Sequence, residues 1–568
     1  MSMRLASILP ILAILTSCAT VPNTSIENLQ GDIPDGNCLV VAETITNGER
    51  IVGPVRYWTE IVLWRVDYDG EDDTFSIDSL SYSLSTQAYM GLVPEGTYRV
   101  GMLYAFLQLG DRSFSARALA PPAIGTFEVK AGHVTNLGTF LYQPFQDRNW
   151  IDTEYPDYAM TRIPDDDLWE SARLANPHIA AQIDADYPVL GWNPDGYDAI
   201  RNDAARMIKE AALPTRIHAL ADGSFLFSGL LGGLYSLRDG AVQNFSLDDN
   251  YKITDVVELS NGQFLIGGEL GKLGTSMPLG ENVKYMPMEQ RLAHILDIDR
   301  SGSGQAYVLS LTNDGYGIYQ YDVDKGSLSF LKKLHKKKIG FIERGYIAYV
   351  EDIRHPNLIG TPEGIAVYFD KLVFRYDEQA DQWSESEALE FNTMYQQRDG
   401  YITGTPYSSW SGTMPLRYSA DGGLNWTESD ETGGFFGGGA SQEPTYRFAD
   451  GEFIRTGEDV DINFWTESEV LDEVPILSST DNGVNWAPVG SVPRGCVTIA
   501  VESSRDELVH ILCNNGAAIS STDRGRSWSE SYAPRIPDFE TFPGALKLRY
   551  QSEELKSTSP PPPIITVD

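Results

Sequence analysis

Three short segments near the C-terminus of this 568-residue chain share the pattern Ser-x-Asp-x-Gly-x-x-Trp. They occupy residues 419–426, 479–486 and 521–528. A serine hydroxyl and an aspartate carboxylate can accept hydrogen bonds from backbone N–H groups across a tight turn, and glycine takes the positive φ that such turns require. The tryptophan buries a large aromatic face beside the next sheet. The pattern therefore predicts three β-hairpins of similar structure.

The repeated pattern resembles the Asp box, or BNR repeat, of sialidase-type β-propellers. The resemblance implies that these residues hold turns and take no part in chemistry. The residues to which it gives this structural role are Ser419, Asp421, Gly423, Trp426, Ser479, Asp481, Gly483, Trp486, Ser521, Asp523, Gly525 and Trp528.

A second repeat lies upstream, where a strand-turn-strand pattern recurs after roughly 40 residues, the length of one propeller blade. Its glycines are Gly223, Gly229 and Gly232 in the first copy and Gly262, Gly268 and Gly271 in the second. Weaker copies continue to residue 528. We therefore predict a β-propeller over residues 213–550 with seven blades, and six or eight remain as alternatives. Residues 545–550 are expected to pair into the first or last blade and close the ring, and residues 551–568 form a proline-rich, disordered tail.

The N-terminal half shows a different organisation. Residues 36–145 contain short alternating or apolar strands, which predict a compact β-sandwich. The segment 93–100, with Pro94, Gly96 and Tyr98, resembles a strand entry of small Ig-like or carboxypeptidase-regulatory-like sandwiches. Residues 150–212 show helical spacing, with a helix start at 164–167 and a second helix over 198–212. They predict a helical bridge, so the expected fold is mainly β.

The first 18 residues have the pattern of an export signal. Arg4 precedes an apolar run at residues 5–15 that is too short to span a bilayer. Residues 15–18 resemble the bacterial lipobox, which implies that residues 1–18 are a signal peptide and that Cys18 carries the lipid. A plain secretory signal is the alternative. Residues 19–35 would be a tether, and Ala19 favours the outer membrane, so we expect a lipid-anchored protein of the bacterial cell envelope.

The composition excludes several function classes. The formal charge is −37, from 80 acidic and 43 basic residues, and such a field repels nucleic acid. The sequence has no phosphate loop and no Cys/His spacing for a metal, so we expect neither a cofactor nor a metal. Cys496 and Cys513 lie in two apolar runs of one predicted hairpin, where they form either a disulfide or two buried thiols.

The sialidase resemblance implies three arginines that bind a substrate carboxylate, the first in an Arg-Ile-Pro motif that opens the first blade. Arg162 and Arg535 begin such motifs, but neither lies at the start of a blade. Arg216 lies at the expected place and is followed by Ile217 and His218. No second and third arginine match, so sialidase chemistry is not assigned.

Another glycosidase would need only two carboxylates across a cleft. Asp255, Glu258, Asp297 and Asp352 are candidates that the sequence does not rank. His218 and His294 lie in apolar strands and are expected to be core or channel residues.

These observations favour a non-catalytic binding or assembly module that uses the propeller's funnel face to hold a protein or glycan. An exo-acting, sialidase-like glycoside hydrolase of the envelope is the alternative, and a structural envelope protein is a third hypothesis.

Overall fold

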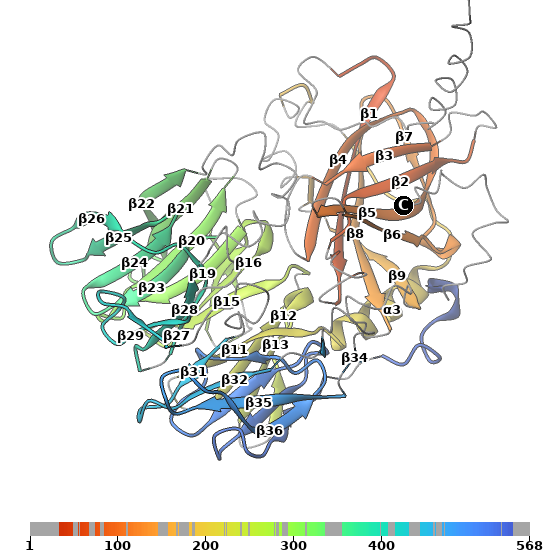
Figure 1. Ribbon diagram of the computed structural model, residues 1–568. Helices are drawn as coiled ribbons and strands as arrows, with labels where there is room; N and C mark the ends of the chain where they lie inside the picture. Colours follow the sequence, from red (N-terminus) through yellow and green to blue (C-terminus); the bar gives the residue numbers. More distant parts are fainter. Residues whose placement is uncertain are drawn as a thin grey trace, which may run out of the picture.

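The computed structural model describes most of residues 33–548. Residues 1–32 and 549–568 lie outside the description, as do several internal segments, the longest being 146–156, 170–180, 336–354, 407–414, 431–443 and 462–468. The predicted signal peptide with Cys18 and the proline-rich tail therefore fall outside the described residues. The predicted fold class is confirmed, because the protein is mainly β and contains many four-stranded sheets (Figure 1).

The N-terminal unit is a sandwich of two sheets, which share a core containing Trp58, Tyr98 and Phe140. The first sheet has the order β4-β1-β8-β9-β41, and β10 also pairs with β8. The second has the order β3-β2-β5-β6, and β7 also pairs with β5. The strands are β1 (Asn37–Thr46), β2 (Glu60–Arg65), β3 (Thr74–Asp78), β4 (Thr86–Pro94), β5 (Gly96–Leu109), β6 (Arg112–Leu119), β7 (Thr126–Val129), β8 (Val134–Pro144), β9 (Tyr158–Ile163), β10 (Val189–Leu190) and β41 (Lys547–Leu548).

This sandwich extends beyond the predicted boundary at residue 145. Strands β9 and β10 come from the segment predicted as a helical bridge, and both pair with β8. The prediction that residues 545–550 close the propeller ring is wrong, because Lys547 and Leu548 pair with Ala159 and Tyr158 on β9. The apolar pattern marked β41 as a strand, but pattern alone cannot choose between two distant sheet edges.

The helix α3 (Asp198–Glu210) also packs against the sandwich. Ala204, Ala205 and Ile208 on its buried face join the sandwich core. Arg201 is 2% exposed and forms ion pairs with Asp195 at 2.6 Å and Asp198 at 2.5 Å.

The C-terminal unit consists of seven consecutive four-stranded antiparallel sheets among the described residues. Sheets 1 to 3 contain β11 (Pro214–Ala219), β12 (Phe225–Gly229), β13 (Leu234–Arg238) and β14 (Ala241–Asn244); β15 (Ile253–Glu258), β16 (Phe264–Gly268), β17 (Leu273–Ser276) and β18 (Lys284–Tyr285); β19 (His294–Arg300), β20 (Ala306–Thr312), β21 (Gly315–Asp322) and β22 (Ser327–His335). Sheets 4 and 5 contain β23 (Asn357–Thr361), β24 (Gly364–Phe369), β25 (Leu372–Asp377) and β26 (Gln382–Glu387); β27 (Phe391–Gln396), β28 (Ile402–Pro406), β29 (Arg417–Ser419) and β30 (Thr427–Glu428).

Sheet 6 contains β31 (Tyr446–Arg447), β32 (Phe453–Thr456), β35 (Glu473–Ser479) and β36 (Ala487–Pro493), with a small hairpin of β33 (Val460–Asp461) and β34 (Glu469–Val470) inserted between its second and third strands. Sheet 7 contains β37 (Thr498–Ile499), β38 (Val509–Leu512), β39 (Ala518–Ser521) and β40 (Ser529–Tyr532). Each sheet is built from one continuous stretch of chain. In an antiparallel sheet the first strand starts at the same edge at which the second ends, the third starts and the fourth ends. We call the face formed by these edges the funnel face.

In the part of the chain that the structure describes, side chains close the ring between sheets 7 and 1, and no strand is exchanged between these sheets. Phe227 of sheet 1 stacks on Tyr532 of sheet 7, with ring centroids 5.0 Å apart. Phe225 packs edge-on against His510 at 4.3 Å. A disulfide joins Cys496 to Cys513 within sheet 7.

The three Ser-x-Asp turns each connect the third and fourth strands of sheets 5, 6 and 7. In the second turn, the Ser479 hydroxyl accepts the Gly483 N–H at 2.9 Å, and Asp481 accepts the Asn485 N–H at 2.9 Å. Gly483 has φ of 85°. In the first turn, a Cβ on Gly423 would lie 2.1 Å from the Tyr368 hydroxyl, so the turn needs glycine for both conformation and space.

The sandwich docks on the funnel face at sheets 1 and 2 (Figure 1). Leu230 and Leu231, in the short 3₁₀ turn η3 (Leu230–Gly232), belong to the sandwich core. The Asn47 side chain accepts the Leu213 N–H and donates to the Ala211 carbonyl, both at 3.1 Å. Among the described residues, no helix is long and apolar enough to cross a membrane.

Candidate functional site

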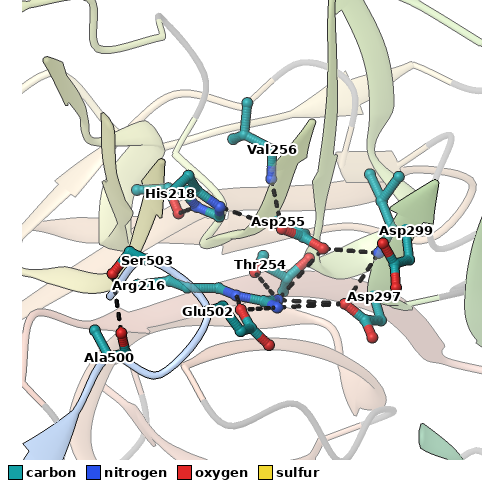
Figure 2. Close-up of polar contacts among 12 residues, drawn as sticks. Arg216, His218, Thr254, Asp255, Val256, Asp297, Asp299, Ala500, Glu502 and Ser503 are labelled. Atoms are coloured by element: carbon teal, nitrogen blue, oxygen red, sulfur yellow. Dashed lines mark hydrogen bonds and ion pairs between the residues drawn. The ribbon is translucent and has the colours of Figure 1, made fainter. Parts of the chain in front are cut away.

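The first strands of sheets 1 to 3 each carry a β-bulge at the same place. The register shifts just before Arg216 on β11, Asp255 on β15 and Asp297 on β19. A bulge adds one residue to a strand and redirects the side chain that follows it. The three side chains therefore converge, as Figure 2 shows.

Arg216 is the centre of the resulting charge cluster. Its guanidinium lies 3.3 Å from Asp255, 3.4 Å from Asp297 and 2.7 Å from Glu502. It also donates to the Thr254 carbonyl at 3.4 Å. One arginine thus connects sheets 1, 2, 3 and 7. Burial opposes its charge, but the three carboxylates raise the pKa of Arg216 well above its usual value.

Glu502 reaches the cluster from the turn between β37 and β38. The Ser503 and Ser504 hydroxyls donate to the Ala500 carbonyl at 3.1 and 2.9 Å, which fixes this turn (Figure 2). Serine hydroxyls often hold such local turns. The sequence analysis did not select Glu502, because its residue type in a loop carries no signal without the partner Arg216.

Asp255 is almost completely buried, and its carboxylate accepts hydrogen bonds from two backbone N–H groups. Its oxygens accept the Val256 N–H at 2.8 Å and the Ile298 N–H of the next sheet at 2.7 Å. Burial opposes its ionisation, but Arg216, His218 and the Ile298 N–H favour the carboxylate, so the pKa of Asp255 is lowered. Asp299 plays a similar part, because it accepts the Gly360 N–H of sheet 4 at 2.6 Å. Burial raises the pKa of Asp299 to about 6.

The pKa of Asp297 is shifted in the opposite direction to that of Asp255. Burial and the neighbouring charges of Asp255 and Glu502 raise its pKa well above the usual range, although Arg216 opposes the shift. The surroundings therefore shift the two carboxyl groups in opposite directions, because the pKa of Asp297 is raised and that of Asp255 is lowered.

His218 lies beside the cluster as a neutral side chain. Its ring contacts the Ser228 hydroxyl at 2.7 Å and Asp255 at 3.4 Å. Burial lowers the pKa of His218 to about 4. His294 accepts the Leu270 N–H at 3.0 Å and lies in the interface between its strand and the preceding turn.

The other candidates from the sequence lie elsewhere. Arg162 is part of the sandwich, where it donates to the Ile124 carbonyl and stacks over Trp192 at 4.2 Å. Glu258 is at the far end of β15, and its carbonyl accepts Arg300 at 2.7 Å. Asp352 and Arg535 fall outside the described residues. The Ser-x-Asp carboxylates occupy separate turns on three different sheets.

No combination of at least three His, Cys, Asp or Glu side chains suited to a metal ion occurs in the described part of the chain. The arrangement around Arg216 is instead a set of ion pairs and carboxyl hydrogen bonds that connects the first strands of the ring.

Fold and site together define a β-propeller protein with an N-terminal β-sandwich. Solved structures with a similar fold include a streptogramin B lyase, at 13% identity over 56% of this chain and 93% of that one, with a TM-score of 0.37. YCF48 from Cyanidioschyzon merolae matches at 14% identity over 54% of this chain and 95% of that one, with a TM-score of 0.37. A putative 6-phosphogluconolactonase from Bacteroides uniformis matches at 12% identity over 55% and 96%, with a TM-score of 0.37.

These neighbours are propeller proteins of varied function, and identities this low carry no information about activity or ligand. No protein-family model matches the sequence, and no curated protein sequence matches it.

Proposed function

We propose that this protein is a non-catalytic binding module that holds a protein or glycan ligand on the funnel face of its propeller. The observation that carries the proposal is the state of Arg216, whose guanidinium is engaged by Asp255, Asp297 and Glu502. An arginine that binds a substrate carboxylate must have its donors free for that substrate. Here the charges at the centre are used to join sheets of the scaffold.

The lengths of the connections support the same proposal. The longest links between propeller strands, 336–356, 407–416, 429–445 and 457–472, all start and end at the funnel edges of sheets 3 to 6. The turns at the opposite edges are mostly short. Binding residues are commonly carried on loops that a rigid scaffold positions. The funnel face of these four sheets is therefore our proposed ligand surface, beside the docked sandwich.

Site-specific photo-crosslinking tests the proposed surface. A photoreactive residue at Glu473 or Arg494, which are exposed at the funnel edge of sheet 6, should capture a ligand from solubilised envelopes or a glycan array. Matched controls at Leu424 and Val484, which are 61% and 52% exposed at the opposite edge, should not. Capture from the control positions alone, or from none of the four, would refute the proposal.

We also propose that Cys18 is lipidated and that the protein is anchored in the bacterial cell envelope, in the outer membrane. Two or more acyl chains hold a protein firmly on a bilayer. Cys18→Ala should abolish labelling by a clickable fatty acid and release the protein from the membrane fraction, whereas Cys38→Ala, at a buried free cysteine, should change neither. Equal labelling of the Cys18→Ala variant would contradict the assignment.

An exo-acting glycoside hydrolase is the second candidate function, and the raised pKa of Asp297 favours it. Asp297 and Glu502 contact the same Arg216 nitrogen at 3.4 and 2.7 Å. Their oxygens therefore lie no more than about 6 Å apart, a limit that allows the carboxyl separation of about 5 Å found in retaining glycosidases. In this reading Asp297 is the acid and Glu502 the nucleophile. Turnover of a fluorogenic glycoside panel that disappears in Asp297→Asn would establish this function and overturn the non-catalytic one.

A further inference from the structure

The sandwich contains a buried arginine whose hydrogen-bonding capacity is only partly used. Arg162 of β9 is 8% exposed, and its Nε donates to the Ile124 carbonyl at 2.8 Å. Its guanidinium lies over the ring of Trp192, 4.2 Å from the ring centroid. In the part of the chain that the structure describes, the terminal nitrogens Nη1 and Nη2 have no hydrogen-bond acceptor and no carboxylate partner. These nitrogens carry the rest of the N–H donors of the side chain.

The carboxylates that act on Arg162 are paired with another arginine. Arg201 forms ion pairs with Asp195 at 2.6 Å and Asp198 at 2.5 Å. Asp195 also accepts Arg201 Nη1 at 2.8 Å and the Tyr197 N–H at 2.9 Å. Burial, and then the charge of Arg201, lower the pKa of Arg162 to about 10, although Asp195 and Asp198 oppose the shift. A buried arginine without an ion pair is unexpected in a chain with 80 acidic and 43 basic residues.

One of the terminal nitrogens borders a gap that a glycine keeps open. Gly125 has φ of 103°, a conformation that favours glycine. A Cβ at this position would lie 2.7 Å from Asp195 Oδ2, 3.6 Å from the Trp192 ring and 3.7 Å from Arg162 Nη2. A carboxylate, an indole and a guanidinium therefore surround the same point, and any side chain on Gly125 would fill part of the space between them.

The guanidinium of Arg162 is held in place without a ligand. The Ile124 carbonyl fixes its Nε, and the Trp192 ring supports its plane. Trp192 is itself anchored, because its Nε1 donates to the Leu137 carbonyl at 2.9 Å and its ring packs edge-on against Phe127 at 5.2 Å. A side chain that is already ordered loses little conformational entropy on binding. The terminal nitrogens of such an arginine match the paired oxygens of a carboxylate.

We propose that Arg162 anchors a binding site on the sandwich for a ligand carboxylate, with Trp192 and Asp195 as the other walls of the site. Nη1 and Nη2 donate to the carboxylate oxygens of the ligand. Asp195 Oδ2 borders the same gap and accepts a hydrogen bond from a hydroxyl or ammonium group next to that carboxylate. The negative charge of Asp195 disfavours a phosphate dianion, so the ligand class is a monoanionic hydroxy or amino carboxylate. The inference goes beyond the proposed function, since the site belongs to the sandwich and not to the propeller.

Titration of the full-length chain with glycolate, followed by NMR of the tryptophan indole N–H signals, tests the site. Glycolate carries the proposed carboxylate and hydroxyl groups, and methyl glycolate is its uncharged counterpart. Glycolate should shift the Trp192 signal, identified by its loss in Trp192→Phe, to a saturating value. Methyl glycolate should not shift it, and inorganic phosphate should bind more weakly than glycolate. The Trp64 signal is the internal control and should move less, because the half-buried Arg99 lies over Trp64 at 4.5 Å without this gap beside it.

Arg162→Lys keeps the charge but loses the paired donors, and it should weaken glycolate binding at least about tenfold. Arg99→Lys is the matched control and should bind glycolate as the wild type does. The proposal would be overturned by the absence of a saturating shift at Trp192, by an equal response to methyl glycolate, by tighter binding of phosphate, or by wild-type affinity in Arg162→Lys. If Arg162→Lys does not fold, the comparison of glycolate with methyl glycolate and phosphate in the wild type decides the question.

Discussion

The disulfide between Cys496 and Cys513 should stabilise sheet 7 at the place where it packs against sheet 1 and closes the ring. The two cysteines flank β37 and β38, so the cross-link encloses the turn that presents Glu502 to Arg216. Sheets 7 and 1 meet beside this turn through side-chain contacts, which include the ring pairs of Phe225 with His510 and of Phe227 with Tyr532. Loss of the cross-link should therefore loosen sheet 7 and the ring closure together.

The size of this effect can be worked out from the sequence separation of 17 residues. Loop-closure entropy for a cross-link of this length gives about 3 kcal/mol at 25 °C. Both cysteines are 4% exposed, so replacing them would also remove buried side-chain volume. Comparing the oxidised with the reduced wild type avoids that second effect, because the side chains stay in place.

The assay is hydrogen exchange of sheet 7 peptides in increasing denaturant, with and without a thiol reductant. The unfolding free energy of this region should fall by about 3 kcal/mol on reduction. The Cys496→Ala/Cys513→Ala variant is the control and should not respond to reductant. A loss below about 1 kcal/mol in the wild type, or an equal response in the control, would refute the reasoning.

Three further predictions concern charges in the ring. Arg216→Met leaves three carboxyl groups without their cation and should lower the free energy of unfolding in denaturant by about 3 kcal/mol. Arg206→Met, on the exposed face of α3, is the control and should have little effect. Equal stabilities of the two variants would contradict a joining role for Arg216. Asp421→Ala, Asp481→Ala and Asp523→Ala should each lower the melting temperature, and unchanged melting in all three would contradict a structural role for these turns. Hydrogen bonds from Ser527 and Ser521 lower the pKa of Asp523 to about 2. The stability that ionised Asp523 contributes is therefore present above the usual Asp pKa and lost as the pH falls through about 2. In Asp523→Asn the melting temperature should fall less steeply over this acid range, and an unchanged pH dependence would refute the reasoning.

The sequence predicted the propeller well, because the information for each sheet is local. The glycine repeat recurs in space as two equivalent turns, in which Gly232 and Gly271 have φ of 68° and 71°. A turn that needs positive φ can be recognised from its residues without knowledge of the rest of the fold. The β-sandwich was also recognisable from alternation, although its boundary was not.

The candidate site was predicted only in part. The sequence selected Arg216 for its place at the start of the first blade and, for a different reason, Asp255 and Asp297 among four unranked carboxylate candidates, and it missed Glu502. Bulges in three strands bring the first three together. No local sequence pattern predicts that Arg216 contacts Glu502, which is 286 positions away along the chain.

The sequence by itself determined where strands and tight turns occur, since backbone conformation at glycine, serine and aspartate depends on neighbours along the chain. Only the tertiary structure decided which distant edges and charges meet. It placed β41 on β9 rather than in the ring, and it surrounded one arginine with carboxylates from three other sheets. The physical reason is that pairing and pKa shifts depend on burial and on distances through space, which are set only when the sheets pack.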